Sequence, residues 1–486
     1  MIQKNNRFWI TMALFLSTFV GAISITIVST SLPSIVGDIH GVSLMNWVFS
    51  IFLLTSVVTT PIYGKLSDQF GRKKIFLTGL LIFLIGSFFS GISNNMEILI
   101  FWRAIQGIGS SAIMPMTYTI ISDIYPFNNK SKLIGINGAI WGISLTIAPL
   151  LGGIVVDTFN WRWIFFINIP IIILSICIIL LFFKEKNFGT KQKIDYLGII
   201  YLSLFLFSIM YVIQLMDSIP NTINSIYYLI IISLISLVLF IRNEYRTINP
   251  LIPMSLFNNK TFIIQNIIIL LMSGFVFGLE IYLPIWIQGI MGLSASFSGL
   301  AITPISIFWI IGSFFSGWLL SKSSASYVTI IGSIFTIISA VCLILLSINS
   351  SIIYFFVISS LCGIGFGLTI TNSTVTSQNI VEQDKVGVAT SFNSLSRILG
   401  QTFIISILEI VMNRQIKIGT LHSNAGITSN KINEFINYKT HLNLSENVLN
   451  SLKNILYNSL HEVFLFCLII VILVVIINLF DKKIDK

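Results

Sequence analysis

The densest group of charged residues in the first part of this sequence is GKLSDQFGRKK, residues 64–74, which lies between two long apolar stretches. Asp68 and Arg72 are four residues apart, a spacing that on a helical turn places carboxylate and guanidinium on one face. Two glycines allow close backbone approach, and an aspartate at the end of a later apolar stretch could join the pair. We interpret these residues as a charged clasp at the inner gate of a helical bundle. A solvated basic turn is the alternative. The residues of the clasp are Gly64, Asp68, Gly71, Arg72 and Asp123.

Arg103 lies within an apolar stretch, where a charged side chain costs at least ~2.5 kcal/mol on insertion scales. One interpretation is functional: the fixed positive charge acts on the protonation of a nearby acid and so takes part in proton coupling. The alternative is structural, with the guanidinium bound to backbone carbonyls or reaching the outer interface.

Two acids remain inside apolar stretches of the second half of the chain, Glu280 and Glu409. Glu280 lies one turn before Pro284 and is followed by Tyr282 and Trp286. Aromatic faces attract cations, so this segment could form a cavity wall that takes both a proton and an organic cation. The alternative places Glu280 at the outer interface. Glu409 lies closer to the end of its apolar stretch, which favours the interface, and it is a secondary candidate.

A glycine-rich stretch follows at residues 138–153. Small residues let helices pack closely, and a proline removes one backbone hydrogen bond. The pattern predicts a helix break near the outer third of a span and a close contact that closes the outer end of the molecule. Ordinary packing of spans is the alternative. The residues concerned are Gly142, Pro149, Gly152 and Gly153.

The composition sets the class of protein that must position these residues. Of 486 residues 55% are hydrophobic and 9% are charged, and the mean hydropathy is +0.92. Soluble domains have roughly 25% charged residues, so the sequence predicts a polytopic, all-α membrane protein. Apolar stretches long enough to cross ~30 Å of hydrocarbon number fourteen. They lie near 8–36, 47–63, 75–93, 97–121, 133–156, 162–183, 195–216, 225–242, 261–287, 298–320, 327–348, 352–373, 388–411 and 461–480.

The basic residues predict the orientation of these spans. With the N-terminus inside, 20 Lys and Arg fall in cytoplasmic segments and 6 outside. The positive-inside rule then predicts that both termini are cytoplasmic. The net charge of +10 is scattered over short loops, which does not indicate a nucleic-acid partner. One long outer loop is predicted at about 412–460.

The two ends of the chain resemble each other. Gly64 and Gly79 have counterparts 253 residues later in Gly317 and Gly332, and QGIG at 106–109 is echoed by CGIG 256 residues later. This predicts two six-span halves, as in many secondary transporters. The expected division is 1–186 for the first half, 187–258 for two inserted spans, and 259–486 for the second half.

The sequence offers little for an enzyme. The four histidines lie at span ends or in the outer loop, and the four cysteines lie in apolar spans without CxxC spacing. A GxxxxGK[ST] phosphate loop is missing from the sequence. We therefore expect no enzyme, no cofactor and no metal site.

Three motifs carry a resemblance to a known family. GKLSDQFGRKK resembles the loop signature between spans 2 and 3 of the major facilitator superfamily, and RAIQGIGSSA from Arg103 resembles its span-4 signature. GISLTIAPLLGG at 142–153 resembles the span-5 signature of its antiporters. With fourteen spans, the chain is similar to the drug:proton antiporter branch. It departs from that branch at Ser24, where an acid is common, and at Ala148, where a glycine is usual.

The resemblance implies a proton-driven exporter of hydrophobic, often cationic compounds, which works by alternating access in a bacterial plasma membrane. Its partners would be small substrates, protons and the lipid bilayer, and it would be a monomer. Two alternatives stay open: an exporter or flippase of an endogenous lipid or amphiphilic metabolite, and a non-transporting membrane sensor. Because Ser24 cannot carry a proton, Glu280 is the expected carrier.

Overall fold

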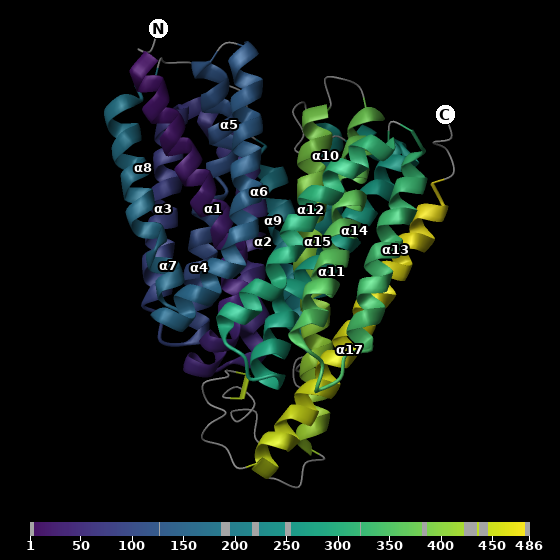
Figure 1. Ribbon diagram of the computed structural model, residues 1–486. Helices are drawn as coiled ribbons and strands as arrows, with labels where there is room; N and C mark the ends of the chain where they lie inside the picture. The colour runs from purple at the N-terminus through teal and green to yellow at the C-terminus, as the bar shows by residue number, and fades with distance from the viewer. Residues whose placement is uncertain are drawn as a thin grey trace.

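The computed structural model describes residues 4–125, 127–185, 195–215, 223–247, 254–320, 322–381, 386–421, 435–436 and 446–481. All regular secondary structure in these ranges is helical. Figure 1 shows the helices in two groups that stand side by side. Lipid offers no hydrogen-bonding partner to a backbone, so long apolar segments fold as helices that satisfy their own N–H and C=O groups.

The first group consists of helices from the first third of the chain. Two of its predicted spans are divided, one between α4 and α5 and one between α7 and α8. The bounds are α1 (Lys4–Ile39), η1 (Val42–Leu44), α2 (Met45–Phe70), α3 (Arg72–Gly91), α4 (Met96–Ser110), α5 (Ile113–Ile124), α6 (Phe127–Thr158), α7 (Trp163–Phe166) and α8 (Asn168–Phe182).

The second group follows two intervening helices. Its first helix, α11, continues directly into the π-helical turn η4. The two intervening helices are α9 (Tyr196–Leu215) and α10 (Ile223–Arg246), followed by the short η3 (Met254–Asn258). The bounds in the second group are α11 (Lys260–Ile285), η4 (Trp286–Ile290), α12 (Ala295–Leu320), α13 (Ala325–Ile344), α14 (Ile352–Asn379), α15 (Val386–Leu421) and α17 (Glu446–Leu479).

Thirteen helical segments within the described ranges are long and apolar enough to cross a membrane. They match thirteen of the fourteen predicted spans. The remaining predicted span, 195–216, falls on α9, whose apolar part over Tyr196–Ile209 is shorter. The all-α membrane fold is confirmed, and the structure is consistent with a count of fourteen.

The two groups use the same pattern of helix contacts. In the first group α3 packs on α4, α1 on α6 and α3 on α8; in the second α13 packs on α14, α11 on α15 and α13 on α17. The repeated glycines lie at equivalent crossings, because a Cβ added at Gly109 would meet the carbonyl of Gly79, and one at Gly365 would meet that of Gly332. The groups meet where α6 contacts α12, α2 contacts α15 and α1 contacts α11.

Two helices extend into the segment predicted as an outer loop, about 412–460. Helix α15 continues to Leu421 and α17 begins at Glu446, so part of this segment is helical, and its place outside the membrane stays a prediction. Apolar side chains at helical spacing in this polar segment explain the difference: Leu452 and Leu456 are buried, and Ile455 packs against Gly419 of α15. Residues 422–434 and 437–445 lie outside the described residues.

Candidate functional site

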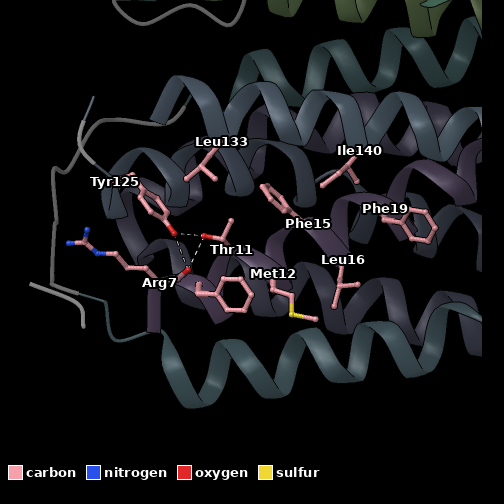
Figure 2. A pocket seen from close by; sticks show the side chains of 10 residues that line it. Arg7, Thr11, Met12, Phe15, Leu16, Phe19, Tyr125, Leu133 and Ile140 are labelled. Atoms are coloured by element: carbon pink, nitrogen blue, oxygen red, sulfur yellow. Dashed lines mark hydrogen bonds between the residues drawn. The ribbon is translucent and has the colours of Figure 1, made fainter. Parts of the chain in front are cut away.

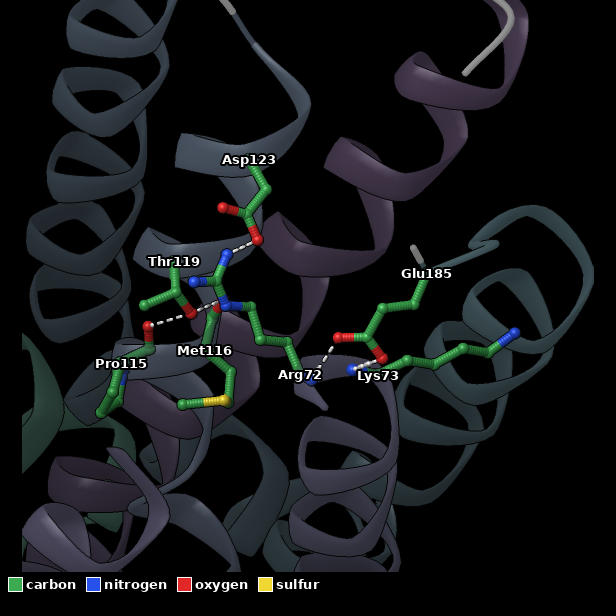
Figure 3. Close-up of polar contacts among 7 residues, drawn as sticks. All are labelled: Arg72, Lys73, Pro115, Met116, Thr119, Asp123 and Glu185. Carbon is green, nitrogen blue, oxygen red and sulfur yellow. Dashed lines mark hydrogen bonds and ion pairs between the residues drawn. The ribbon is translucent and has the colours of Figure 1, made fainter. Parts of the chain in front are cut away.

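Arg72, the first residue of α3, forms an ion pair with Asp123 near the end of α5 (Figure 3). The pair joins two helices of the first group at the inner end of the bundle, as that end is predicted from the loop charges. Their side chains are 24% and 37% exposed, so water screens the attraction. Such pairs contribute about 0–1 kcal/mol to the free energy of folding, so this pair can break and form again with a small change in free energy.

The predicted helical pairing of Asp68 with Arg72 is wrong in its geometry. Helix α2 ends at Phe70, and α3 begins at Arg72, so these two residues belong to different helices. Gly71 stands between them with φ +93°, which interrupts the helix and redirects the chain. Gly64 and Asp68 belong to α2, but their surroundings lie outside the described residues, and their part in the clasp stays a prediction.

Glu185, a residue that sequence reasoning missed, holds the start of α3. Its carboxylate accepts the backbone N–H of Arg72 at 2.5 Å and that of Lys73 at 3.1 Å (Figure 3). In return the ammonium of Lys73 donates to the carbonyl of Phe183 at 2.5 Å, beyond the end of α8. A carboxylate is stabilised by the unpaired N–H groups at a helix N-terminus. A Cβ at Gly71 would lie 2.7 Å from Glu185 Oε2, so a larger residue there would displace this carboxylate, and the positive φ itself favours glycine. Glu185 is the one acid in KEKNFGTKQK, residues 184–193, which was the available signal.

Arg103 is fully buried and binds backbone carbonyls on two neighbouring helices. Its Nε donates to the carbonyl of Val48 at 3.0 Å and its Nη2 to that of Ser24 at 3.3 Å. Nη1 donates to the side chain of Gln106 at 2.7 Å, and the guanidinium lies 4.2 Å from the ring centroid of Phe52. These contacts agree with the structural interpretation, in which the guanidinium is bound to backbone carbonyls. In the part of the chain that the structure describes, Arg103 has no ion pair, and its coupling role stays a prediction.

The network around Arg103 extends through neutral side chains. Gln106 donates to the hydroxyl of Ser87, which in turn donates to the carbonyl of Phe165 and accepts from Asn168. Together with the carbonyls of α1 and α2, this network connects helices α1, α2, α3, α4, α7 and α8. Within the described ranges the buried hydroxyl of Ser24 has no hydrogen-bond partner. Because the Ser24 carbonyl already accepts from Arg103, an acid placed at this position would lie near the guanidinium.

The glycines of α6 make two different contacts. A Cβ at Gly152 would lie 2.6 Å from the carbonyl oxygen of Ile27 in α1, within the same group. A Cβ at Gly153 would lie 2.7 Å from Ser296 Cα in α12, across the interface between the groups. Gly142 faces open space. The predicted helix break is wrong: α6 continues past Pro149 to Thr158, because one missing N–H does not end a helix that its neighbours hold on several sides.

We call the contacts of α1 and α6 with η4 and α12 the outer seam. Asp157 of α6 accepts the backbone N–H groups of Ala295 and Ser296 at 3.3 and 2.8 Å, and so caps α12 from the other group. Gln288 of η4 donates to the carbonyl of Thr30 in α1 at 3.0 Å. At the same end of the molecule, Asn46 at the start of α2 donates to the hydroxyl of Tyr282 in α11 at 2.9 Å. The two groups are therefore joined at the end opposite the N-terminus.

The two candidate acids are both buried in the second group. Glu280 is 5% exposed, and its Oε2 has no hydrogen-bond partner. It is close enough to Cys362 of α14 to interact electrostatically, as Glu409 is to Tyr282. Helix α15 continues for twelve residues beyond Glu409, whose side chain is 3% exposed, and its place at the membrane interface stays a prediction.

Trp286 belongs to the aromatic packing of the second group. It is fully buried and packs among Phe355, Tyr457, His461 and Phe464 of α14 and α17. Tyr282 is also buried, but its hydroxyl contacts the first group through Asn46. Of the two aromatic residues predicted for a substrate cavity, Tyr282 alone reaches the interface between the groups, and substrate contact by either residue stays a prediction.

Two repeated helical groups, joined at one end through helix termini and close glycine contacts, are the architecture of secondary transporters built from internal repeats. The chain belongs to the Major Facilitator Superfamily, whose sequence model matches residues 14–404. The resemblance inferred from the three motifs is thereby confirmed.

Curated relatives and solved structures agree with this assignment. Multidrug resistance protein 3 of Bacillus subtilis is 32% identical, covering 99% of this chain and 96% of that protein. The efflux pump SdrM of Staphylococcus aureus is 31% identical over 80% of this chain and 86% of its own length. A bacterial homologue of the human lysosomal transporter Spinster, in an inward-facing, unoccupied conformation, is similar with a TM-score of 0.71 at 15% identity, covering 98% of this chain and 97% of its own.

Proposed function

We propose that the chain exports hydrophobic, often cationic compounds from a bacterial cell in exchange for protons. The relatives named as multidrug transporters support drug export. The arrangement of the outer seam supports alternating access, because few polar contacts and close glycine packing can separate when one group rocks against the other. We further propose a monomer with both termini in the cytoplasm and no cofactor.

The observation that carries proton coupling is the burial of Glu280. A buried carboxylate in an apolar site is strongly unfavourable, whereas a protonated carboxyl group is tolerated. Glu280 lies half a turn from Tyr282, which contacts Asn46 across the interface. We propose that gain and loss of a proton at Glu280 change the stability of this contact and so couple the proton to rocking.

The test uses the purified chain in liposomes, with a cationic dye and an imposed pH gradient. One pH unit supplies about 1.4 kcal/mol per proton, so exchange of one proton for one cation is expected to accumulate the dye about tenfold. Glu280→Gln, which mimics the protonated carboxyl, is expected to let the dye equilibrate without accumulation. Glu97→Gln is the control, because Glu97 is an exposed acid in the first turn of α4.

The outcomes separate the two parts of the proposal. If the wild-type chain moves the dye but never accumulates it under a pH gradient, drug:proton exchange is wrong. If wild-type and Glu280→Gln chains accumulate the dye equally, exchange stands and Glu280 is not the coupling site. In that case Asp123 and Glu409 are the next residues to substitute.

A further inference from the structure

A cavity of about 750 Å³ lies beside the first half of α1, whereas the outer seam involves the second half of the same helix (Figure 2). Most of its lining comes from α1, and the rest comes from Tyr125, directly after α5, and from α6. At its rim Phe8 and Met12 are exposed, so the cavity opens to the surface of the helical bundle. We call it the α1 groove. It is lined by Arg7, Phe8, Thr11, Met12, Phe15, Leu16, Phe19, Tyr125, Leu133 and Ile140.

The groove is polar at one end and apolar along the rest of its length. At the end nearest the N-terminus, the Thr11 hydroxyl lies 2.9 Å from the Tyr125 hydroxyl, and both hydroxyls donate to the carbonyl of Arg7. These hydrogen bonds satisfy the hydroxyl groups of Thr11 and Tyr125 at this end of the groove. The lining from Met12 to Phe19 carries no charged side chain.

Arg7 brings an unused positive charge to the polar end. Its Nε is buried without a hydrogen-bond partner, and its guanidinium carbon lies 5.8 Å from the ring centroid of Tyr125. Among the residues that the structure describes, no carboxylate forms an ion pair with it. Figure 2 shows the guanidinium directed away from the apolar lining, beyond the cluster of Thr11 and Tyr125.

The length of the groove fits one leaflet of a bilayer. Arg7 and Phe19 are separated by twelve residues along α1, about 18 Å at 1.5 Å per residue. Half of a ~30 Å hydrocarbon core is about 15 Å. A ligand with its head at Arg7 would therefore reach the middle of the membrane with its tail beside Phe19.

We propose that the α1 groove binds one anionic phospholipid from the leaflet on the side of the N-terminus. The phosphate pairs with the Arg7 guanidinium, a group whose planar donors match phosphate oxygens. One acyl chain follows the apolar lining past Leu16 and Phe19 towards Ile140. A cationic drug is disfavoured at this site because Arg7 would repel it. The proposal depends neither on drug export nor on which side of the membrane the N-terminus occupies.

The test measures which lipids remain on the full chain after extraction from membranes that contain equal amounts of phosphatidylglycerol and phosphatidylcholine. Native mass spectrometry is expected to show one retained phosphatidylglycerol. Loss of a charge-assisted hydrogen bond in Arg7→Gln is expected to lower this retention about tenfold. Lys322→Gln removes a positive charge near Trp318, outside the groove, and is expected to retain the lipid.

Two further measurements locate the lipid and identify its source. A phosphatidylglycerol with a photoreactive group in its acyl chain is expected to label residues 12–19 and 133–140 in the wild-type chain, and Leu16→Trp is expected to abolish this labelling by filling the groove. The proposal is wrong if phosphatidylcholine is retained equally, if Arg7→Gln retains phosphatidylglycerol as the wild type does, or if labelling falls elsewhere. Displacement by excess inorganic phosphate would likewise overturn it, since the groove would then recognise a free anion.

Discussion

The start of α3 and the start of α13 are equivalent positions in the internal repeat, yet they are held in different ways. Helix α3 begins after Gly71, which has no side chain to cap it, and the carboxylate of Glu185 from the end of α8 takes that place. Helix α13 begins after Ser324, whose own hydroxyl accepts the N–H of Tyr327. There the contact with α17 is neutral: Asn478 donates to the carbonyl and hydroxyl of Ser326.

The comparison separates scaffold from function. By the offset of 253 residues, Gly71, Arg72 and Lys73 correspond to Ser324, Ala325 and Ser326. The helix crossings are repeated in both groups, whereas the charged residues Arg72 and Lys73 have neutral counterparts. Neutral hydrogen bonds are sufficient to hold such a helix start. We infer that the charges at the start of α3 take part in the change of conformation.

The largest effect is expected from Arg72→Ala, which removes the ion pair with Asp123. Because both side chains are partly exposed, folding and insertion should be unaffected, while transport should fall at least about tenfold if the pair holds one conformation. The measurement is dye efflux at equal expression, with Asp68→Asn as the second variant. Lys322→Ala, in the counterpart loop, is the control and should transport normally. Normal efflux by Arg72→Ala would reduce the charged loop to a signal for orientation.

The next largest effect on transport is expected at the outer seam. It tests whether contacts there affect transport separately from the charges at the inner end. Gly153→Leu should reduce export severalfold, because its side chain must enter the space of Ser296 in α12. Gly152→Leu should also impair export, through the contact with Ile27 of α1. The matched control is Gly142→Leu, since Gly142 faces open space. Equal transport by all three variants would mean that these glycines serve ordinary helix packing and have no special part in export.

Much of this architecture could be predicted from the sequence, because an apolar segment in lipid has few options besides a helix. The charged positions Arg72, Asp123 and Arg103 could be singled out for the same reason: charges are rare in such a sequence. The contact of Asp123 with Arg72 was expected, but most other tertiary contacts could not be predicted. Glu185 resembled one more charge in a basic segment, and its role depends on how the end of α8 meets α3.

The errors also have physical causes. Asp68 and Arg72 were placed on one helix because their spacing is helical, but Gly71 adopts a φ that other residues avoid. The end of α15 could not be read from hydropathy, which marks the edge of an apolar stretch and not the end of the helix. Asp157 and Asn46 contact the opposite group, and local sequence carries no information on such a contact.

A smaller effect, on stability, is expected from Gly71→Ala. The φ of +93° with ψ of +148° is accessible almost solely to glycine, and the new Cβ would meet Glu185. Backbone strain of this kind costs about 1–3 kcal/mol. At the equivalent position Ser324→Ala should cost about 1 kcal/mol or less, since it removes one cap with a 3.4 Å hydrogen bond. Unfolding in sodium dodecyl sulfate would compare the two, and equal losses would mean that Gly71 is not required for its conformation.

The smallest effect should come from Glu185→Gln, which keeps the shape of the side chain and removes its charge. One amide oxygen can still accept from the N–H of Arg72 or Lys73, so about 1 kcal/mol of stability should be lost rather than the larger loss expected for Glu185→Ala. The loss should shrink as salt is added, because it arises from a charge at a helix terminus.

Asn478→Ala is the matched variant in the second group. It should cost a similar amount of stability at every salt concentration, because the contact that it removes is neutral. Transport measurements distinguish the two variants further. Glu185→Gln should slow dye efflux about twofold to threefold, whereas Asn478→Ala should leave efflux unchanged at equal expression. If both variants slow efflux to the same extent, the two helix starts contribute alike to transport, and the charges at α3 have no special part in the conformational change.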